Sequence, residues 1–188
     1  IDGAVEFVTG PVTPPAGNGS VRLFTGTNGT ARSEIGNTIS FFGTRLDSIT
    51  TAFSYSTYAT LMPGDKLPVV EMRVDVGGFS DTLTFRPNAN PGQVPALNTW
   101  QTWSLKDGLW FSDVFSILAL PNPTTLPNYL AEFPDATITR VLFATDGGVF
   151  VTDVFDQNVD NFILNDTVYD FEKAGVVLIG PPLNKDEC

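Results

Sequence analysis

Residues 159–172 read V-D-N-F-I-L-N-D-T-V-Y-D-F-E, and this stretch decides the fold class. Asn165 and Asp166 favour a tight two-residue turn, and residues that prefer strands flank them on both sides. The segment is therefore predicted to form an antiparallel hairpin with one largely aromatic face and one polar face. Four cross-strand pairs follow from this turn: Phe162 with Tyr169, Asp160 with Phe171, Asn161 with Asp170, and Val159 with Glu172.

A second hairpin is predicted over residues 69–86, where Gly77 and Gly78 form the turn. The strict alternation of apolar and polar residues indicates one buried face and one solvated face. Asp81 breaks the pattern, because the register places it opposite Val74. On the buried face the predicted apolar pairs are Val70 with Phe85, Met72 with Leu83, and Val76 with Phe79.

The rest of the chain alternates short strand-like segments with turns rich in Gly, Pro and Asn. The predicted helix covers residues 125–133, starting at Thr125 with Pro127 in its first turn. A length of 188 residues with 42% hydrophobic residues suits one domain with a real core. We therefore expect an all-β antiparallel sandwich, or jelly roll, over residues 1–172, with at most one short helix and a C-terminal extension over residues 173–188.

The net charge and the residue composition make several classes of function less favourable. The chain carries 10 basic and 21 acidic residues, so its net charge of -11 disfavours nucleic acid as a partner. No apolar run reaches 18 residues, which disfavours insertion into a membrane. Histidine is absent, and with it the commonest general base and zinc ligand. We therefore expect a protein that is not an enzyme.

Several features indicate a secreted or cell-surface protein. Sequons for N-glycosylation begin at Asn18, Asn28 and Asn165, and the chain starts at Ile1 without a signal-like segment, as a processed form would. The single cysteine, Cys188, excludes a disulfide within the chain. It is expected to be an inert terminal thiol, with a disulfide to a partner chain as the alternative.

Three segments resemble the jelly-roll modules of secreted and surface-anchored microbial proteins. They are residues 7–23, F-V-T-G-P-V-T-P-P-A-G-N-G-S-V-R-L, residues 99–104, T-W-Q-T-W-S, and the residues 159–172 already quoted. Those modules are similar in fold to concanavalin-like and galactose-binding-like domains, which include carbohydrate-binding modules. The resemblance implies an extracellular location and a non-catalytic binding or surface role.

Two candidate ligand sites follow from residue types. Trp103, Trp110 and Phe111 would form an aromatic platform for sugar rings if they were exposed, whereas burial in the core is the simpler interpretation. Asp156, Asn158 and Asp160 alternate in the way that a calcium-binding loop spaces its oxygen ligands. The alternative for these three residues is a solvated acidic loop.

Paired carboxylates allow a remote catalytic alternative. Asp170 and Glu172 share the polar face of the hairpin predicted over residues 159–172, the closing hairpin. Two carboxylates held about 5 to 9.5 Å apart can hydrolyse a glycosidic bond. A solvated sheet face explains the same residues more simply. A polysaccharide-active enzyme is therefore the remote alternative.

The apolar run Val176, Val177, Leu178 and Ile179 requires cover on both faces. It is expected to form either a further strand of the domain or a strand that pairs with a neighbouring copy. The first functional hypothesis is a structural extracellular subunit that self-associates by strand addition, into filaments where the contact does not close. The alternative is a glycan-binding module, stabilised by calcium and with polysaccharide as its partner.

Overall fold

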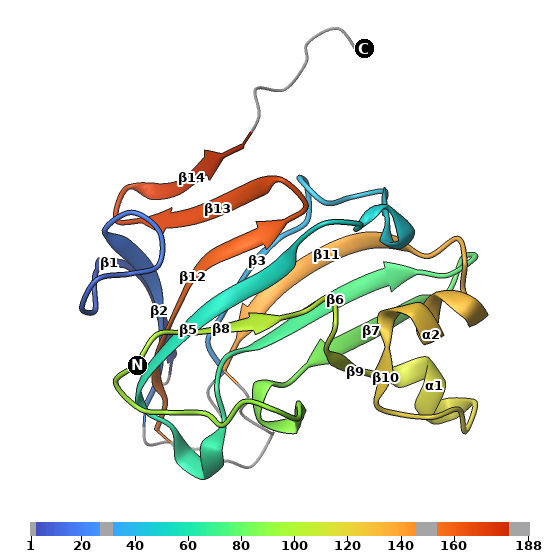
Figure 1. Cartoon of the computed structure of the whole chain (residues 1–188), viewed down its shortest axis with the longest axis horizontal. Coiled ribbons are helices and arrows are strands. Elements are labelled where there is room, and N and C mark those ends of the chain that lie inside the picture. Colours follow the sequence, from blue (N-terminus) through green and yellow to red (C-terminus); the bar gives the residue numbers. More distant parts are fainter. Residues whose placement is uncertain (1–2, 27–31, 146–153, 181–188) are drawn as a thin grey trace, which may run out of the picture.

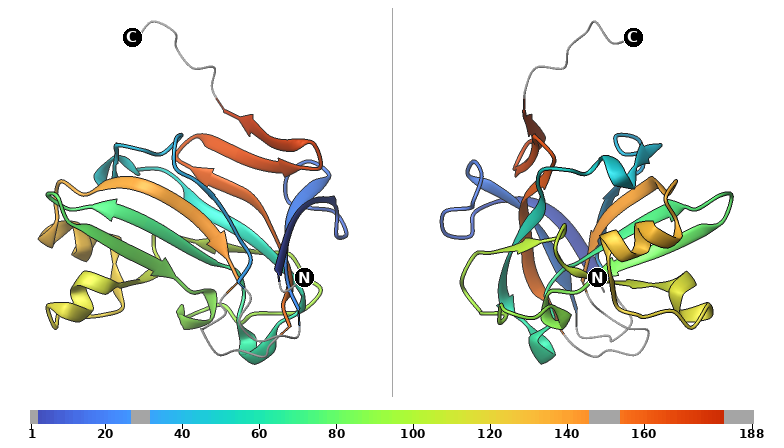
Figure 2. Two further views of the ribbon diagram at one scale, coloured as in Figure 1. Left: turned by 180° about the vertical axis from the view of Figure 1, so that it is seen from behind. Right: turned by 45° about the vertical axis from the view of Figure 1, so that its right-hand side comes forward.

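A computed structural model describes residues 3–26, 32–145 and 154–180 of the chain. Its strands form two antiparallel seven-stranded sheets that pack face to face (Figures 1 and 2). The predicted all-β sandwich is confirmed. Cys188 lies outside the described residues. None of the helices in the described ranges has the length and apolar character that a membrane crossing needs.

The first sheet, sheet A, is built around one central strand near the end of the chain. β12 (Asp156–Leu164) pairs with β5 (Phe53–Leu61) along one side. Along its other side it pairs first with β2 (Gly19–Thr25) and then with β13 (Thr167–Glu172). The outer strands of sheet A are β1 (Gly3–Thr9) beside β2, β14 (Gly175–Ile179) beside β13, and β8 (Gln101–Ser104) beside β5.

The second sheet, sheet B, has β11 near its centre, with β6 on one side of it and β3 and β4 on the other. The predicted hairpin over residues 69–86 is formed by β6 and β7, with the expected register. The strands of sheet B are β3 (Glu34–Asn37), β4 (Thr44–Arg45), β6 (Val69–Asp75), β7 (Ser80–Phe85), β9 (Leu109–Ser112), β10 (Thr124–Thr125) and β11 (Thr137–Ala144).

Two short α-helices, instead of at most one, lie at the β9–β10 end of sheet B (Figure 1). α2 (Leu126–Glu132) starts as predicted, because the Thr125 side chain accepts a hydrogen bond from the Asn128 N–H. α1 (Asp113–Ile117) was not predicted. In the part of the chain that the structure describes, three 3₁₀ turns accompany these elements, at Leu46–Ser48, Pro63–Asp65 and Pro87–Ala89.

The closing hairpin forms as predicted only near its turn. Phe162 pairs with Tyr169, but the three other predicted pairs are wrong. Asn161 has a φ of 52°, and at this point the register of β12 shifts. Beyond this bulge β12 leaves β13, so that Val159 pairs with Val21 of β2.

The core lies between the two sheets and is rich in aromatic rings. Tyr55 of β5 meets Phe85 and Phe143 of sheet B, with centroid distances of 6.0 and 5.7 Å. Tyr55 is fully buried, and its hydroxyl donates to the Pro68 carbonyl at 2.6 Å. The polar tip of this ring is therefore satisfied inside the core.

Asp81, the residue that broke the predicted pattern, is buried on the core side of β7 with 1% of its surface exposed. Its carboxylate accepts hydrogen bonds from the Ser112 hydroxyl at 2.6 Å, the Tyr129 hydroxyl at 2.9 Å and the Val114 N–H at 3.1 Å. Ser112 is also the N-cap of α1. Asp81 therefore joins β7 to both helices.

Candidate functional site

The predicted aromatic platform is not at the surface. Trp103 is 2% exposed and Trp110 is fully buried, because both side chains point between the sheets. Their indole N–H groups donate to the Thr57 hydroxyl and the Leu105 carbonyl, each at 2.9 Å. Phe111 is half-buried on the opposite face of β9, below the Arg86 guanidinium. The three rings therefore do not form one sugar-stacking surface.

The predicted calcium loop is a strand. Asp156, Asn158 and Asp160 lie at alternating positions of β12, where neighbouring members are about 7 Å apart along the chain. An extended strand cannot wrap these residues around one ion. Among residues 3–26, 32–145 and 154–180, no group of three or more acidic or cysteine side chains could by itself hold a metal ion.

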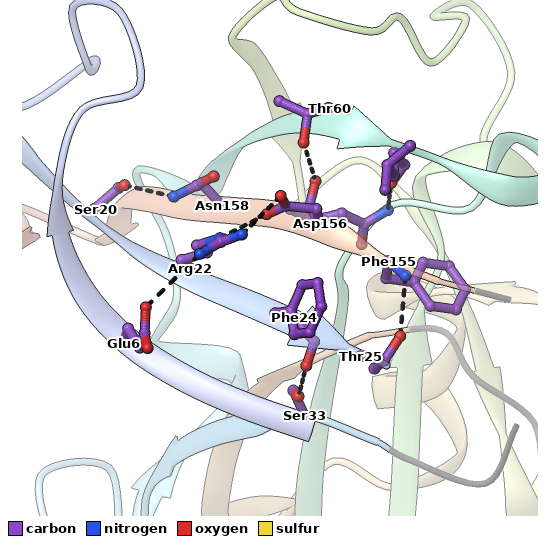
Figure 3. A network of polar contacts seen from close by, with 12 residues as sticks. Glu6, Ser20, Arg22, Phe24, Thr25, Ser33, Thr60, Phe155, Asp156 and Asn158 are labelled. Carbon is purple, nitrogen blue, oxygen red and sulfur yellow. Dashed lines mark hydrogen bonds and ion pairs between the residues drawn. The ribbon is translucent and has the colours of Figure 1, made fainter. Parts of the chain in front are cut away.

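Each of these three side chains has its own protein partners instead. Asp156 accepts hydrogen bonds from Arg22 Nε and Nη2 at 2.7 and 2.8 Å, and Glu6 lies 3.8 Å from the same guanidinium (Figure 3). Asn158 donates to the Ser20 hydroxyl at 2.9 Å (Figure 3). This network ties β1, β2 and β12 together.

Asp160, unlike Asp156 and Asn158, faces the loop that connects β1 and β2. Its carboxylate accepts hydrogen bonds from the N–H groups of Ala16 and Phe171. Asp170 and Glu172, the remote catalytic pair, approach the same loop at Gly17. Asp170 is only 4% exposed, so it does not lie on the solvated face that the sequence predicted.

The apolar run at residues 176–179 forms β14, the last described strand of sheet A. Val176, Val177, Leu178 and Ile179 are 47%, 46%, 61% and 51% exposed. Within the described ranges β14 pairs with β13 alone. Residues 176–179 therefore form a further strand of the domain, which is one of the two alternatives that the sequence predicted. It presents an edge of main-chain groups and apolar side chains that the described residues do not cover.

An apolar groove lies beside β14, between the edges of the two sheets. Its volume is about 260 Å³. Val176 and Leu178 line one side, and β3 and β11 of sheet B line the other. Five aromatic residues are among those that line the groove: Phe41, Phe143, Phe162, Tyr169 and Phe171.

The polar groups at the groove satisfy one another. Asn37 Nδ2 donates to the Ser40 hydroxyl at 2.9 Å, while Asn37 Oδ1 accepts from the N–H groups of Ile39 and Ser40. Burial raises the pKa of Tyr169, which keeps its hydroxyl neutral. The groove therefore suits apolar side chains better than a charged or heavily hydroxylated ligand.

The groove was missed by sequence reasoning because its walls come from distant segments. Phe41 and Phe162 meet edge to face with centroids 5.8 Å apart, and Phe143 lies 5.2 Å from Phe162. The apolar run at residues 176–179 was the one local signal of this site.

Comparisons with known proteins add little to this description. No protein-family model matches the chain, and a comparison with curated proteins finds no match. Among solved structures, the chain is similar to part of an exo-beta-agarase, with 9% identity and a TM-score of 0.45. The alignment covers 97% of this chain and 22% of the agarase chain.

Proposed function

We propose that this protein is a non-catalytic extracellular subunit that self-associates by strand addition at β14. The observation that carries the proposal is an edge strand with four consecutive apolar side chains, each about half exposed. A strand added at this edge would gain main-chain hydrogen bonds from β14 and cover apolar side chains on both of its faces.

The two faces of β14 offer different contacts. Val176 and Leu178 stand beside Phe171 and Tyr169 across the β13–β14 ladder and face the groove. Val177 stands beside Asp170 and belongs to the opposite face. An added strand would therefore extend the groove wall on one face and cover Val177 on the other.

A second copy of the chain is the partner that fits this edge best. Two β14 strands can pair antiparallel about a two-fold axis, so that apolar residues of one strand meet apolar residues of the other in reciprocal pairs. The strand carries no charge, although the chain has a net charge of -11. Contact at β14 therefore brings two copies together at an uncharged part of their surfaces.

The expected affinity is modest. Covering a half-exposed Val, Leu or Ile stabilises by about 1 kcal/mol, so the eight side chains of two β14 strands contribute at most about 8 kcal/mol. New main-chain hydrogen bonds add about 1 kcal/mol each. Association costs about 4–15 kcal/mol, so the dissociation constant would be on the order of micromolar at the lower cost, and no stable dimer would form at the upper cost.

Sedimentation velocity over a range of protein concentrations tests the proposal. Leu178→Lys places a charge on the most exposed residue of β14 and should hold the protein monomeric. Val94→Lys is the control, because Val94 is 79% exposed but lies outside every strand. It should associate as the unmodified protein does.

Salt provides a second measurement of the same contact. Association should strengthen as ionic strength rises, because salt screens the repulsion between two acidic copies. An unmodified protein that stays monomeric at every concentration and salt level would refute the proposal. Equal association of Leu178→Lys and the unmodified protein would place the contact elsewhere.

A further inference from the structure

The face of sheet B that points away from the core carries a small polar hollow in which three arginines gather. Its volume is about 170 Å³, and it spans β3, β11, β6 and β7, which are neighbours in the sheet (Figure 1). Three of the ten basic residues of a chain with a net charge of -11 therefore lie in one small region. The polar residues that line the hollow are Arg32, Glu34, Glu71, Arg73, Thr82 and Arg140.

Two of these arginines stand beside each other on neighbouring strands. The register of sheet B places Arg140 of β11 opposite Arg73 of β6. Both side chains point away from the core, because Met72 and Val141, the next residues along each strand, are buried. Like charges at paired positions destabilise a sheet. A negatively charged ligand would compensate this cost, so the pair indicates binding of an anion.

The glutamates of the hollow do not neutralise Arg73. Glu71 Oε1 lies 2.7 Å from Arg32 Nη2, and Glu34 lies 3.3 Å from Arg32 Nε and 3.0 Å from Arg140 Nη2. Within residues 3–26, 32–145 and 154–180, the Arg73 guanidinium forms neither an ion pair nor a hydrogen bond. The glutamates therefore hold Arg32 and Arg140 in position, while the donors of Arg73 remain available.

We propose that Arg73 and Arg140 bind the carboxylate group of a small hydroxylated acid, such as a sugar acid. A guanidinium presents its N–H donors in a planar fork that matches the two oxygens of a carboxylate. The Thr82 hydroxyl stands opposite Arg73 on β7 and has no hydrogen-bond partner in the described part of the chain. It can therefore bond a hydroxyl group of the ligand beside the carboxylate.

Size and charge both favour a small acid over a polyanion. Pockets for drug-sized ligands have volumes of about 300–1,000 Å³. The hollow, with about 170 Å³, has room for one acidic group and the atoms around it. The net charge of -11 also repels a polyanion more strongly than it repels a ligand with a single charge.

Nuclear magnetic resonance of the isotope-labelled full chain measures binding of sodium glucuronate at constant ionic strength. Glucuronate should shift the amide signals of residues 71–73, Thr82 and residues 140–142, with a dissociation constant of about 0.1–10 mM. Glucose has a similar ring without the carboxylate and should leave these signals unchanged. Inorganic sulfate, which lacks the ring hydroxyls, should bind about threefold more weakly or worse.

Arg73→Gln removes the unpaired guanidinium and should weaken glucuronate binding about tenfold or more. Arg45→Gln is the matched control. It removes the same charge from sheet B, but at an arginine that pairs with Asp47 and Asp135 outside the hollow, so it should change the affinity by about twofold or less.

Thermal unfolding checks that the variant still folds. Arg73 is exposed, so Arg73→Gln should melt within about 2 °C of the unmodified protein. If it does not fold, Arg73→Lys is the second variant. It keeps the charge but loses the planar fork, and should weaken glucuronate binding about threefold or more.

Several results would overturn the proposal. One is the absence of shifts at these residues up to about 50 mM glucuronate. Others are equal shifts with glucose, sulfate binding as tight as that of glucuronate, or equal affinities of Arg73→Gln and Arg45→Gln. A loss of self-association in Arg73→Gln would assign the hollow to an acidic side chain of a second copy instead. Because β14 belongs to sheet A, Leu178→Lys should bind glucuronate normally whether or not β14 mediates self-association.

Discussion

Replacing Asp81 with alanine tests whether a buried carboxylate fixes the two helices to sheet B. The substitution removes three hydrogen bonds, from the hydroxyl groups of Ser112 and Tyr129 and from the Val114 N–H. Tyr129 is fully buried, so its hydroxyl would be left without an acceptor. Burial is the main cause that raises the pKa of Tyr129, and it remains in the variant, so the hydroxyl cannot escape this cost by ionising.

The expected loss can be worked out from these contacts. Each hydrogen bond to a charged group contributes about 1.5–3 kcal/mol, and a buried donor without a partner costs about 1–3 kcal/mol. Removing the carboxylate also relieves the cost of burying a charge, which offsets part of the loss. We therefore expect Asp81→Ala to lower the free energy of unfolding by about 3–4 kcal/mol, within the range known for broken buried networks.

Urea denaturation followed by tryptophan fluorescence measures this change, since Trp103 and Trp110 lie in the core. Asp135→Ala is the control, because Asp135 pairs with Arg45 at the surface and its side chain is 84% exposed. It should cost at most about 1 kcal/mol. If Asp81→Ala costs no more than this control, the carboxylate does not hold the helices and the reasoning fails.

Two further predictions concern the carboxylates under the loop. In metal-free buffer, the free energy of unfolding should fall as pH rises from about 4 to about 6. Burial raises the pKa of Asp160 from 3.8 to about 6, so in this interval the folded protein keeps a proton that the unfolded chain has released. The raised pKa of Asp160 corresponds to at most about 3 kcal/mol of unfolding free energy. Asp160→Asn should remove this contribution, as measured by urea denaturation at several pH values. If the pH dependence of stability is unchanged in that variant, Asp160 is not its source. Gly19→Ala should destabilise the fold by about 1–3 kcal/mol, because its Cβ would lie 2.7 Å from the Glu172 Cα. Gly43→Ala, which meets no atom within 4 Å, should show only the smaller cost of its positive φ in the same assay.

Local patterns predicted those parts of the fold whose partners are close in sequence. The β6–β7 hairpin has its turn and both strands within residues 69–86, so alternation and two glycines determine its register. Thr125 likewise starts α2 through a contact with Asn128, three residues on. Such features need no knowledge of the rest of the chain.

The closing hairpin shows where this reasoning stops. Its turn and the pairing of Phe162 with Tyr169 are local, but Val159 pairs with a residue near the other end of the chain. No pattern within residues 159–172 reveals that competing partner. The bulge at Asn161 has the same origin, since it allows β12 to change neighbours.

The candidate sites were harder to predict for a related reason. Alternation shows that Trp103 lies on one face of its strand, but not that this face meets the other sheet. Similarly, the spacing of Asp156 and Asp160 is visible in the sequence, whereas the approach of Asp170 to the loop at Gly17 requires the tertiary fold. The exposed run at residues 176–179 was visible because its apolar character is continuous.

The position of β12 in sheet A also bears on how the protein acquires its structure. Arg22 and Asp156, which join β2 to β12, are 134 residues apart. On a ribosome, β2 can pair with β1 early, but most of the chain must be synthesised before β12, its neighbour on the other side, emerges. Pairing over such separations slows folding, and the edge of β2 that awaits β12 must be kept from other chains during that delay.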